Sequence, residues 1–132
     1  MIKKILAVFA ALILIAGVLL AGVIYKIDFQ KEKIKTSVSD DKIHTLTVYE
    51  IGEPEFPFGS ANCCFVLKEN RKNISKLDFE ICNDGGRALP ENVEIQWQDD
   101  CAFVTVNGEE QYNTVYHLYF DGTTDEKVLC EE

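Results

Sequence analysis

The first 25 residues differ sharply in their hydrophobic pattern from the rest of the chain. An unbroken apolar run of 21 residues covers positions 5–25 and contains no charged side chain. A helix needs about 20 residues to cross the ~30 Å hydrocarbon core, and a backbone in lipid must satisfy its own hydrogen bonds. The run therefore predicts one transmembrane helix over residues 5–25, with the lipid bilayer as its partner.

A cleaved signal peptide is the competing interpretation of this run. Its apolar region would be about 7–15 residues long and would end in small residues. The run here is longer, and cleavage near Gly17 or Ala21 would leave Ile15 or Leu19 at the −3 position, where a small residue is expected. The length and these positions favour a retained signal-anchor over a cleaved signal.

From about residue 44 onward the apolar positions recur with a period of two. Residues 74–82 are the clearest case, because apolar and charged side chains alternate as in a strand with one buried face. Six strands are predicted, at 44–51, 63–68, 74–82, 93–98, 101–106 and 112–120, with a short seventh near Val128. Connections are short, and Asn107-Gly108 is a strong hairpin turn. The fold class is thus all-β, a small antiparallel meander or sandwich.

The alternation also predicts which side chains form the core of this sheet structure. The six expected core residues are Leu77, Phe79, Ile81, Val93, Ile95 and Trp97. The chain then divides into an anchor at 1–25, a juxtamembrane stalk at 26–39 and a β-domain at 40–132. Because the stalk is charged and has few apolar residues, we expect it to continue the helix for a turn or two and then fray.

Charge is distributed unevenly along the chain. Residues 40–132 contain 7 basic and 20 acidic side chains, a net charge of −13. Such a field repels nucleic acid, so a nucleic-acid partner is excluded. Solubility is the simplest use of this charge, and the sharper interpretation is a cationic protein or cell-envelope glycan as partner.

The lysines that flank the apolar run bear on membrane orientation. Two precede it and four follow it before residue 40, and the positive-inside rule counted strictly places the β-domain in the cytoplasm. A short N-terminal tail with a signal-like helix, however, normally exports the domain on its C-terminal side. We expect a single-pass protein of the cell membrane with an extracytoplasmic β-domain.

Five cysteines lie in the β-domain, at Cys63, Cys64, Cys82, Cys101 and Cys130. There is no C-x-x-C pair, so a zinc ribbon or a thioredoxin-like site is not supported. Cys63 and Cys64 are adjacent on a predicted strand and point to opposite faces, so one should be buried and the other exposed. Free thiols acting as small hydrophobic residues are favoured over disulfides or a reactive thiol.

No catalytic, cofactor or metal site is predicted. His44 and His117 lack a nucleophile motif, and residues 121–126 lack the D-x-D-x-D-G order of a cation loop. The loop Phe56-Pro57-Phe58-Gly59 is the candidate binding segment. Its two aromatic residues could form an exposed tip, but exposed paired Phe is unfavourable without a partner, so we expect them to plug one end of the sheet.

Several short segments together resemble a known group of proteins. These are Ser39-Asp40-Asp41-Lys42, Ile51-Gly52, Phe56-Pro57-Phe58-Gly59-Ser60, Asn83-Asp84-Gly85 and Gly108-Glu109-Glu110-Gln111. Over residues 39–122 the chain resembles small bacterial, mainly Gram-positive, membrane-anchored all-β domains of unknown function. The resemblance implies a location at the membrane and a compact domain, with no established activity. The five cysteines depart from this pattern.

These observations favour an envelope-associated interaction domain rather than an enzyme, because no acid, base and nucleophile can be assembled into one set. Two alternatives belong to other classes. One is an immunity or inhibitor protein that binds a cationic toxin or hydrolase through the acidic surface. The other is a thiol-based redox sensor or enzyme that uses Cys63 or Cys64.

Overall fold

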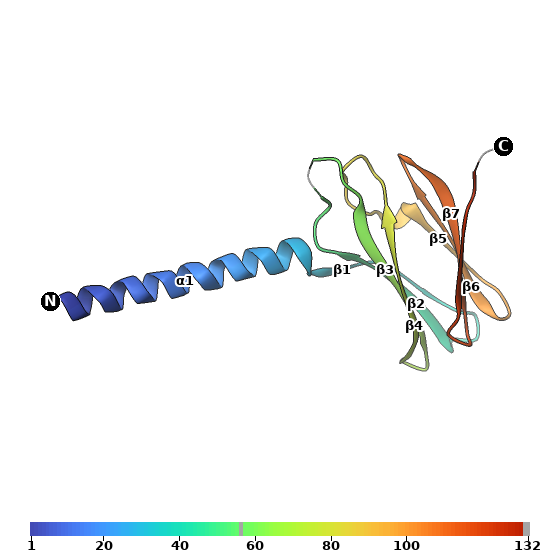
Figure 1. The fold of residues 1–132 in the computed structure, drawn as a ribbon. Coiled ribbons are helices and arrows are strands. Elements are labelled where there is room, and N and C mark those ends of the chain that lie inside the picture. The colour runs from blue at the N-terminus through green and yellow to red at the C-terminus, as the bar shows by residue number, and fades with distance from the viewer. Residues whose placement is uncertain (56, 131–132) are drawn as a thin grey trace.

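The computed structural model describes residues 1–55 and 57–130, and in this part of the chain it contains one long helix, a short 3-10 turn and eight strands (Figure 1). The elements are α1 Ile2–Asp28, β1 Lys31–Val38, β2 His44–Ile51, β3 Ala61–Glu69, β4 Lys72–Ile81, η1 Pro90–Asn92, β5 Val93–Trp97, β6 Cys101–Gly108, β7 Gln111–Tyr119 and β8 Thr124–Val128. The predicted all-β class with one N-terminal helix is confirmed. The expected number of about six strands is too low.

Helix α1 has no buried residue and extends away from the β-domain (Figure 1). Its 27 residues make it about 40 Å long at 1.5 Å per residue. It is long and apolar enough to cross a membrane, and it contains the whole of the predicted span.

The frayed stalk expected at residues 26–39 is wrong. Helix α1 ends at Asp28, and Lys31–Val38 forms β1, which pairs antiparallel with β2 from Lys31↔Ile51 to Val38↔Thr45. β1 is an edge strand with an exposed outer face, so few of its residues need to be apolar.

Two inward contacts hold this edge strand on the domain. Ile34 packs against the core, and Lys35 Nζ donates hydrogen bonds to the carbonyls of Pro90 and Val93. Lys35 therefore links β1 to the start of the second sheet. Hydrophobic periodicity cannot predict a link of this kind.

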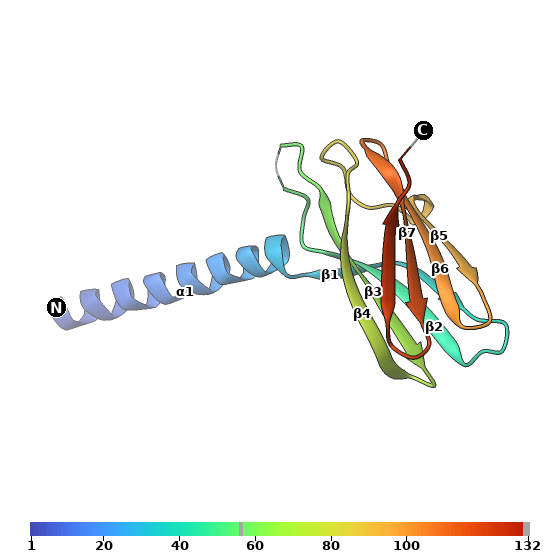
Figure 2. The ribbon, with the colours of Figure 1, turned by 45° about the vertical axis from the view of Figure 1, so that its right-hand side comes forward.

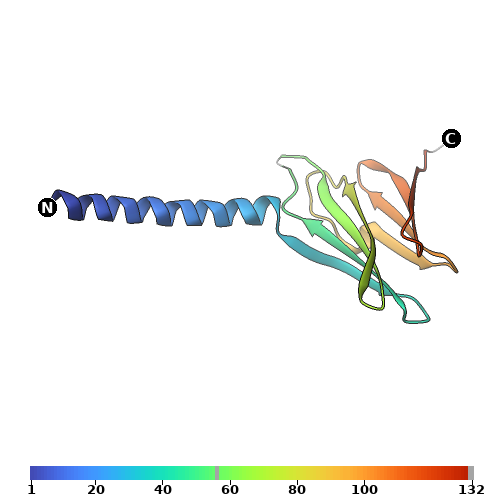
Figure 3. The same cartoon turned by 60° about the horizontal axis from the view of Figure 1, so that its bottom comes forward.

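The eight strands form two four-stranded meanders, β1-β2-β3-β4 and β5-β6-β7-β8, in which every pair is antiparallel. The two sheets pack face to face as a sandwich, and residues 82–92 connect them. In the views of Figures 1 and 3 the first sheet lies between α1 and the second sheet. The outer face of the second sheet is therefore directed away from the helix.

The core lies between the sheets and is centred on three aromatic rings. Phe65 is fully buried, stacks on Phe79 with a centroid distance of 4.0 Å, and meets the edge of Tyr116 at 5.4 Å. Of the predicted core residues, Phe79, Ile81 and Val93 are buried, while Leu77, Ile95 and Trp97 are partly buried against the core. Trp97 Nε1 also donates a hydrogen bond to Ser37 Oγ of β1 at 2.9 Å.

Candidate functional site

The two adjacent cysteines of β3 are both buried, so the expectation that one of them is exposed is wrong. Cys63 faces the core. Cys64 points to the outer face, where its Cα partners on the neighbouring strands are Tyr49 and Asp78. Larger residues beside a small one on a sheet surface can cover it completely, which accounts for the absence of exposed Cys64 surface. All five cysteines are free thiols, and no disulfide joins them.

The environment of these thiols gives no support to a redox role. Burial, followed by the charge of Glu50, raises the pKa of Cys63 to about 12, and burial also raises the pKa of Cys64. A reactive cysteine needs access to solvent and a lowered pKa, since the thiolate is the nucleophile. Cys63 and Cys64 have neither property.

We expect the domain to lose stability in alkali. The pKa of Cys63 rises from 9.0 to about 12, and desolvation with the nearby Glu126 raises that of Tyr116 from 10.0 to about 12. Above about pH 9 the unfolded chain loses these protons first, so the free energy of unfolding falls by up to ~1.4 kcal/mol per pH unit and group until the folded pKa is reached. Urea unfolding at a series of pH values measures how steeply the free energy of unfolding falls with pH. Cys63→Ala should make this fall less steep. An equally steep fall in Cys63→Ala would mean that Cys63 does not contribute to it.

An ion pair between the buried Glu50 and the partly exposed Arg87 fastens the connection between the sheets. The Glu50 side chain is 3% exposed, and its Oε2 accepts a hydrogen bond from Arg87 Nε at 2.9 Å and lies 2.7 Å from Nη2. Its Oε1 accepts the backbone N–H of Ala88 at 3.0 Å. Glu32 lies 2.6 Å and Glu53 3.9 Å from the same guanidinium. Hydrogen bonding to Glu50 raises the pKa of Arg87.

This cluster has a structural role and little capacity left for a ligand. Arg87 lines two open hollows of about 260 and 280 Å³, but its nitrogens already bind carboxylates. One feature of the sequence indicates this ion pair. Glu50 continues the inward positions of Leu46 and Val48, and a charge at an inward strand position requires a partner.

The two histidines lie in different environments. His44 is buried at the start of β2 and stacks on Phe120 with a centroid distance of 3.7 Å. Its Nε2 is 3.3 Å from Glu69 Oε1 without hydrogen-bond geometry. His117 lies on the outer face of β7 and is half-buried. Within residues 1–55 and 57–130, no group of three or more His, Cys, Asp or Glu side chains is placed to hold a metal ion.

An aromatic face lies on the outer side of the second sheet. It consists of Phe103 on β6 and of His117 and Tyr119 on β7, all half-buried. The ring centroids of Phe103 and His117 are 5.1 Å apart at 71°, and those of His117 and Tyr119 are 5.9 Å apart and nearly parallel. Strand register creates this cluster, because Phe103 and His117 are directly opposite each other.

Carboxylates border the aromatic face. Asp125 of β8 is directly opposite His117, and the adjacent turns carry Asp100 and Asp121. The pKa of Tyr119 is raised, first by desolvation and then by nearby negative charges, among them those of these three carboxylates. The face therefore combines π surfaces with a negative potential, and both attract cations.

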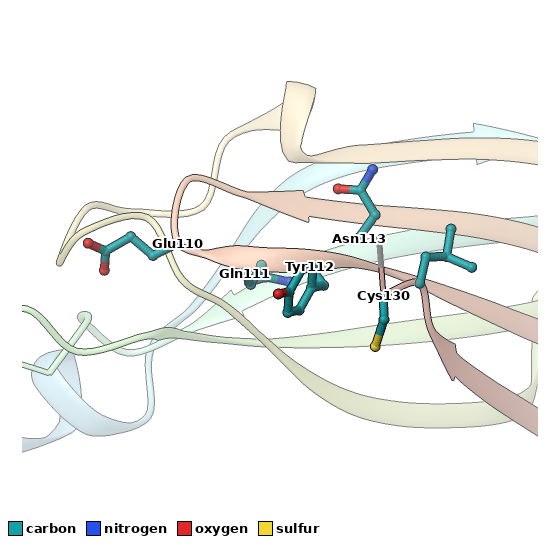
Figure 4. A pocket seen from close by; sticks show the side chains of 6 residues that line it. Glu110, Gln111, Tyr112, Asn113 and Cys130 are labelled. Atoms are coloured by element: carbon teal, nitrogen blue, oxygen red, sulfur yellow. The ribbon is translucent and has the colours of Figure 1, made fainter. Parts of the chain in front are cut away.

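A third open hollow, of about 590 Å³, lies where β7 begins, beside the segment after β8. Its lining residues are Glu110, Gln111, Tyr112, Asn113, Leu129 and Cys130. Gln111 Oε1 is already engaged by the backbone N–H of Cys82 at 2.6 Å. Glu110 points away from the other labelled side chains (Figure 4). The polar groups do not converge on one point, as they would in a small-molecule site.

The predicted binding loop has a different structure from the one expected. Phe56 lies outside the described residues. Pro57 and Phe58 do not plug the sheet: both are exposed, and Phe58 is 71% exposed. This part of the expectation is wrong, because the loop closes on the side of α1 and not over the core.

Comparisons with protein families, curated proteins and solved structures return no match to this chain. The resemblance to small Gram-positive membrane-anchored domains therefore stays an expectation from the sequence. Function has to be inferred from the geometry of the domain.

Proposed function

We propose that this protein is a single-pass, non-enzymatic interaction module of the cell membrane. In this proposal α1 is a retained anchor, the β-domain lies outside the cytoplasm, and the aromatic face binds a basic polypeptide segment. The observation that carries the proposal is the aromatic face itself: Phe103, His117 and Tyr119 form one continuous ring surface, bordered by Asp125.

The position of this face supports the proposal. The first sheet separates it from α1, so a bilayer around the helix would leave it open to solution (Figures 1 and 3). Half-buried aromatic side chains supply contact area with little loss of conformational freedom, and they are enriched where proteins bind one another. The surrounding carboxylates favour a cationic partner and speed its approach.

We expect a lysine-rich peptide to bind the full chain in detergent with an affinity that falls as salt rises. Tyr119→Ala should weaken this binding by about 5- to 30-fold, because it removes a ring that a cation would contact, worth roughly 1–2 kcal/mol. Fluorescence anisotropy of a labelled oligolysine measures the affinity.

Tyr112→Ala is the matched control, since the same change is made on the same strand at an exposed ring outside the aromatic face. It should leave the affinity unchanged. Equal losses in the two variants would mean that binding follows overall charge and would contradict the proposed face. Preferential binding of envelope glycan fragments over the peptide would contradict the proposed partner.

A further inference from the structure

The end of α1 is fastened to the β2–β3 connection. The backbone N–H of Glu53 donates to the Ile27 carbonyl at 2.6 Å, and that of Gly52 donates to the Gln30 carbonyl at 2.7 Å. Gly52 has φ +70°, and a Cβ there would collide with the Ile27 carbonyl. A glycine is thus required for this approach. The β-domain is held in one orientation on the helix rather than swinging on a linker.

The β2–β3 connection reaches back to the level of the last turn of α1. Figures 2 and 3 show this green loop beside the end of the helix from two directions. Asp28 lies three residues beyond Tyr25, which is about 4.5 Å along the helix axis. If residues 5–25 cross the hydrocarbon core, this level falls within the interfacial layer, which is about 5–8 Å thick on each side.

The part of the β2–β3 connection that carries Phe58 is supported by the rest of the domain. Gly85 has φ +78°, and a Cβ on it would lie 2.5 Å from the Pro57 carbonyl oxygen and 3.0 Å from the Phe58 Cα. The β4–β5 connection therefore packs directly against this loop. The backbone N–H of Gly59 also donates to the Glu55 carbonyl at 2.7 Å. Phe58 is nevertheless 71% exposed.

Two further aromatic side chains are exposed at the same end of α1. Tyr25 is 62% and Phe29 is 60% exposed. Aromatic rings collect at the boundary between hydrocarbon and water, where membrane proteins carry belts of them. Exposed rings at the end of an apolar helix thus extend the surface that the helix would bury in lipid.

We propose that Phe58 inserts into the headgroup layer of the bilayer that α1 crosses, making the β2–β3 loop a second attachment point. This inference rests on the proposed membrane anchoring. It explains why an exposed phenylalanine is held on a braced loop facing the helix end, and it fixes the tilt of the domain. The aromatic face is then held away from the lipid.

The test places a tryptophan in the loop. Trp97→Phe removes the native tryptophan, and Phe58→Trp or Tyr112→Trp is added to that background in the full chain. Each protein is reconstituted into phosphatidylcholine vesicles whose acyl chains are brominated near the headgroup. We expect the fluorescence of the Phe58→Trp protein to be quenched several-fold more than that of the Tyr112→Trp protein, whose substituted residue is on β7 of the second sheet.

Flotation of the vesicles separates the two proposals. If the proteins do not float with the vesicles, the anchoring fails and this inference fails with it. If both float and are quenched equally, anchoring by α1 stands and insertion of Phe58 is overturned. Circular dichroism should show the same β-structure in both double variants as in Trp97→Phe alone, because Phe58 and Tyr112 are exposed.

Discussion

Phe65→Ala should lower the free energy of unfolding by about 3–5 kcal/mol, the largest loss we expect from any single substitution in this domain. Phe65 has no exposed surface and contacts Phe79 and Tyr116, so its removal leaves a cavity between the two sheets. The surrounding strands are hydrogen-bonded on both sides and cannot collapse fully into that space. A loss of this size would leave a small domain only marginally folded.

Urea unfolding of the full chain in detergent measures this effect. Fluorescence of Trp97 reports the transition, since its ring is partly buried against the core. Tyr112→Ala removes an aromatic ring of similar size from an exposed position and should change stability by no more than about 0.5 kcal/mol. A loss below about 1 kcal/mol for Phe65→Ala would mean that the sheets do not pack around this ring.

Arg87→Ala should be the second most damaging change, at about 3 kcal/mol. The Glu50 carboxylate would stay buried, having lost its cation and the hydrogen bond from the guanidinium, and would retain only the Ala88 backbone N–H. Removing the cation beside a buried carboxylate is costly because the remaining charge is desolvated without compensation. The loop 82–92 would also lose its fastening to the first sheet.

A second substitution tests this explanation. Glu50→Gln combined with Arg87→Ala removes the stranded charge, so the double variant should be more stable than Arg87→Ala alone. Lys72→Ala, which removes an exposed cation from β4, is the control and should have little effect. If the double variant were as unstable as the single one, loss of packing and not the uncompensated charge would be the cause.

Hydrophobic periodicity predicted the elements whose inward residues are apolar. β2, β4, β6 and β7 alternate clearly, and the class of fold followed from them. The polar pattern of residues 31–38 predicts a stalk and not β1, because an edge strand can be polar at most positions. Its inward lysine makes backbone hydrogen bonds to a segment 55 residues or more away, and no local pattern records such a contact.

The candidate sites could be predicted only in part. The acidic character of the domain is a property of composition. The aromatic face depends on register, because Phe103 and His117 are 14 positions apart and meet only when β6 and β7 pair as they do. The exposure of Phe58 likewise depends on the path of its loop toward α1, which is set by backbone contacts between distant segments.

Labelling of intact cells tests most directly the claim that α1 anchors an extracytoplasmic domain. Cys130 is exposed, whereas Cys63, Cys64 and Cys101 are buried and Cys82 is half-buried, so a membrane-impermeant maleimide should react chiefly with Cys130. We expect labelling before lysis, loss of the label in Cys130→Ser, and a labelled chain whose mass includes residues 1–25. Labelling only after lysis, or a labelled chain that lacks the N-terminal helix, would contradict the claim.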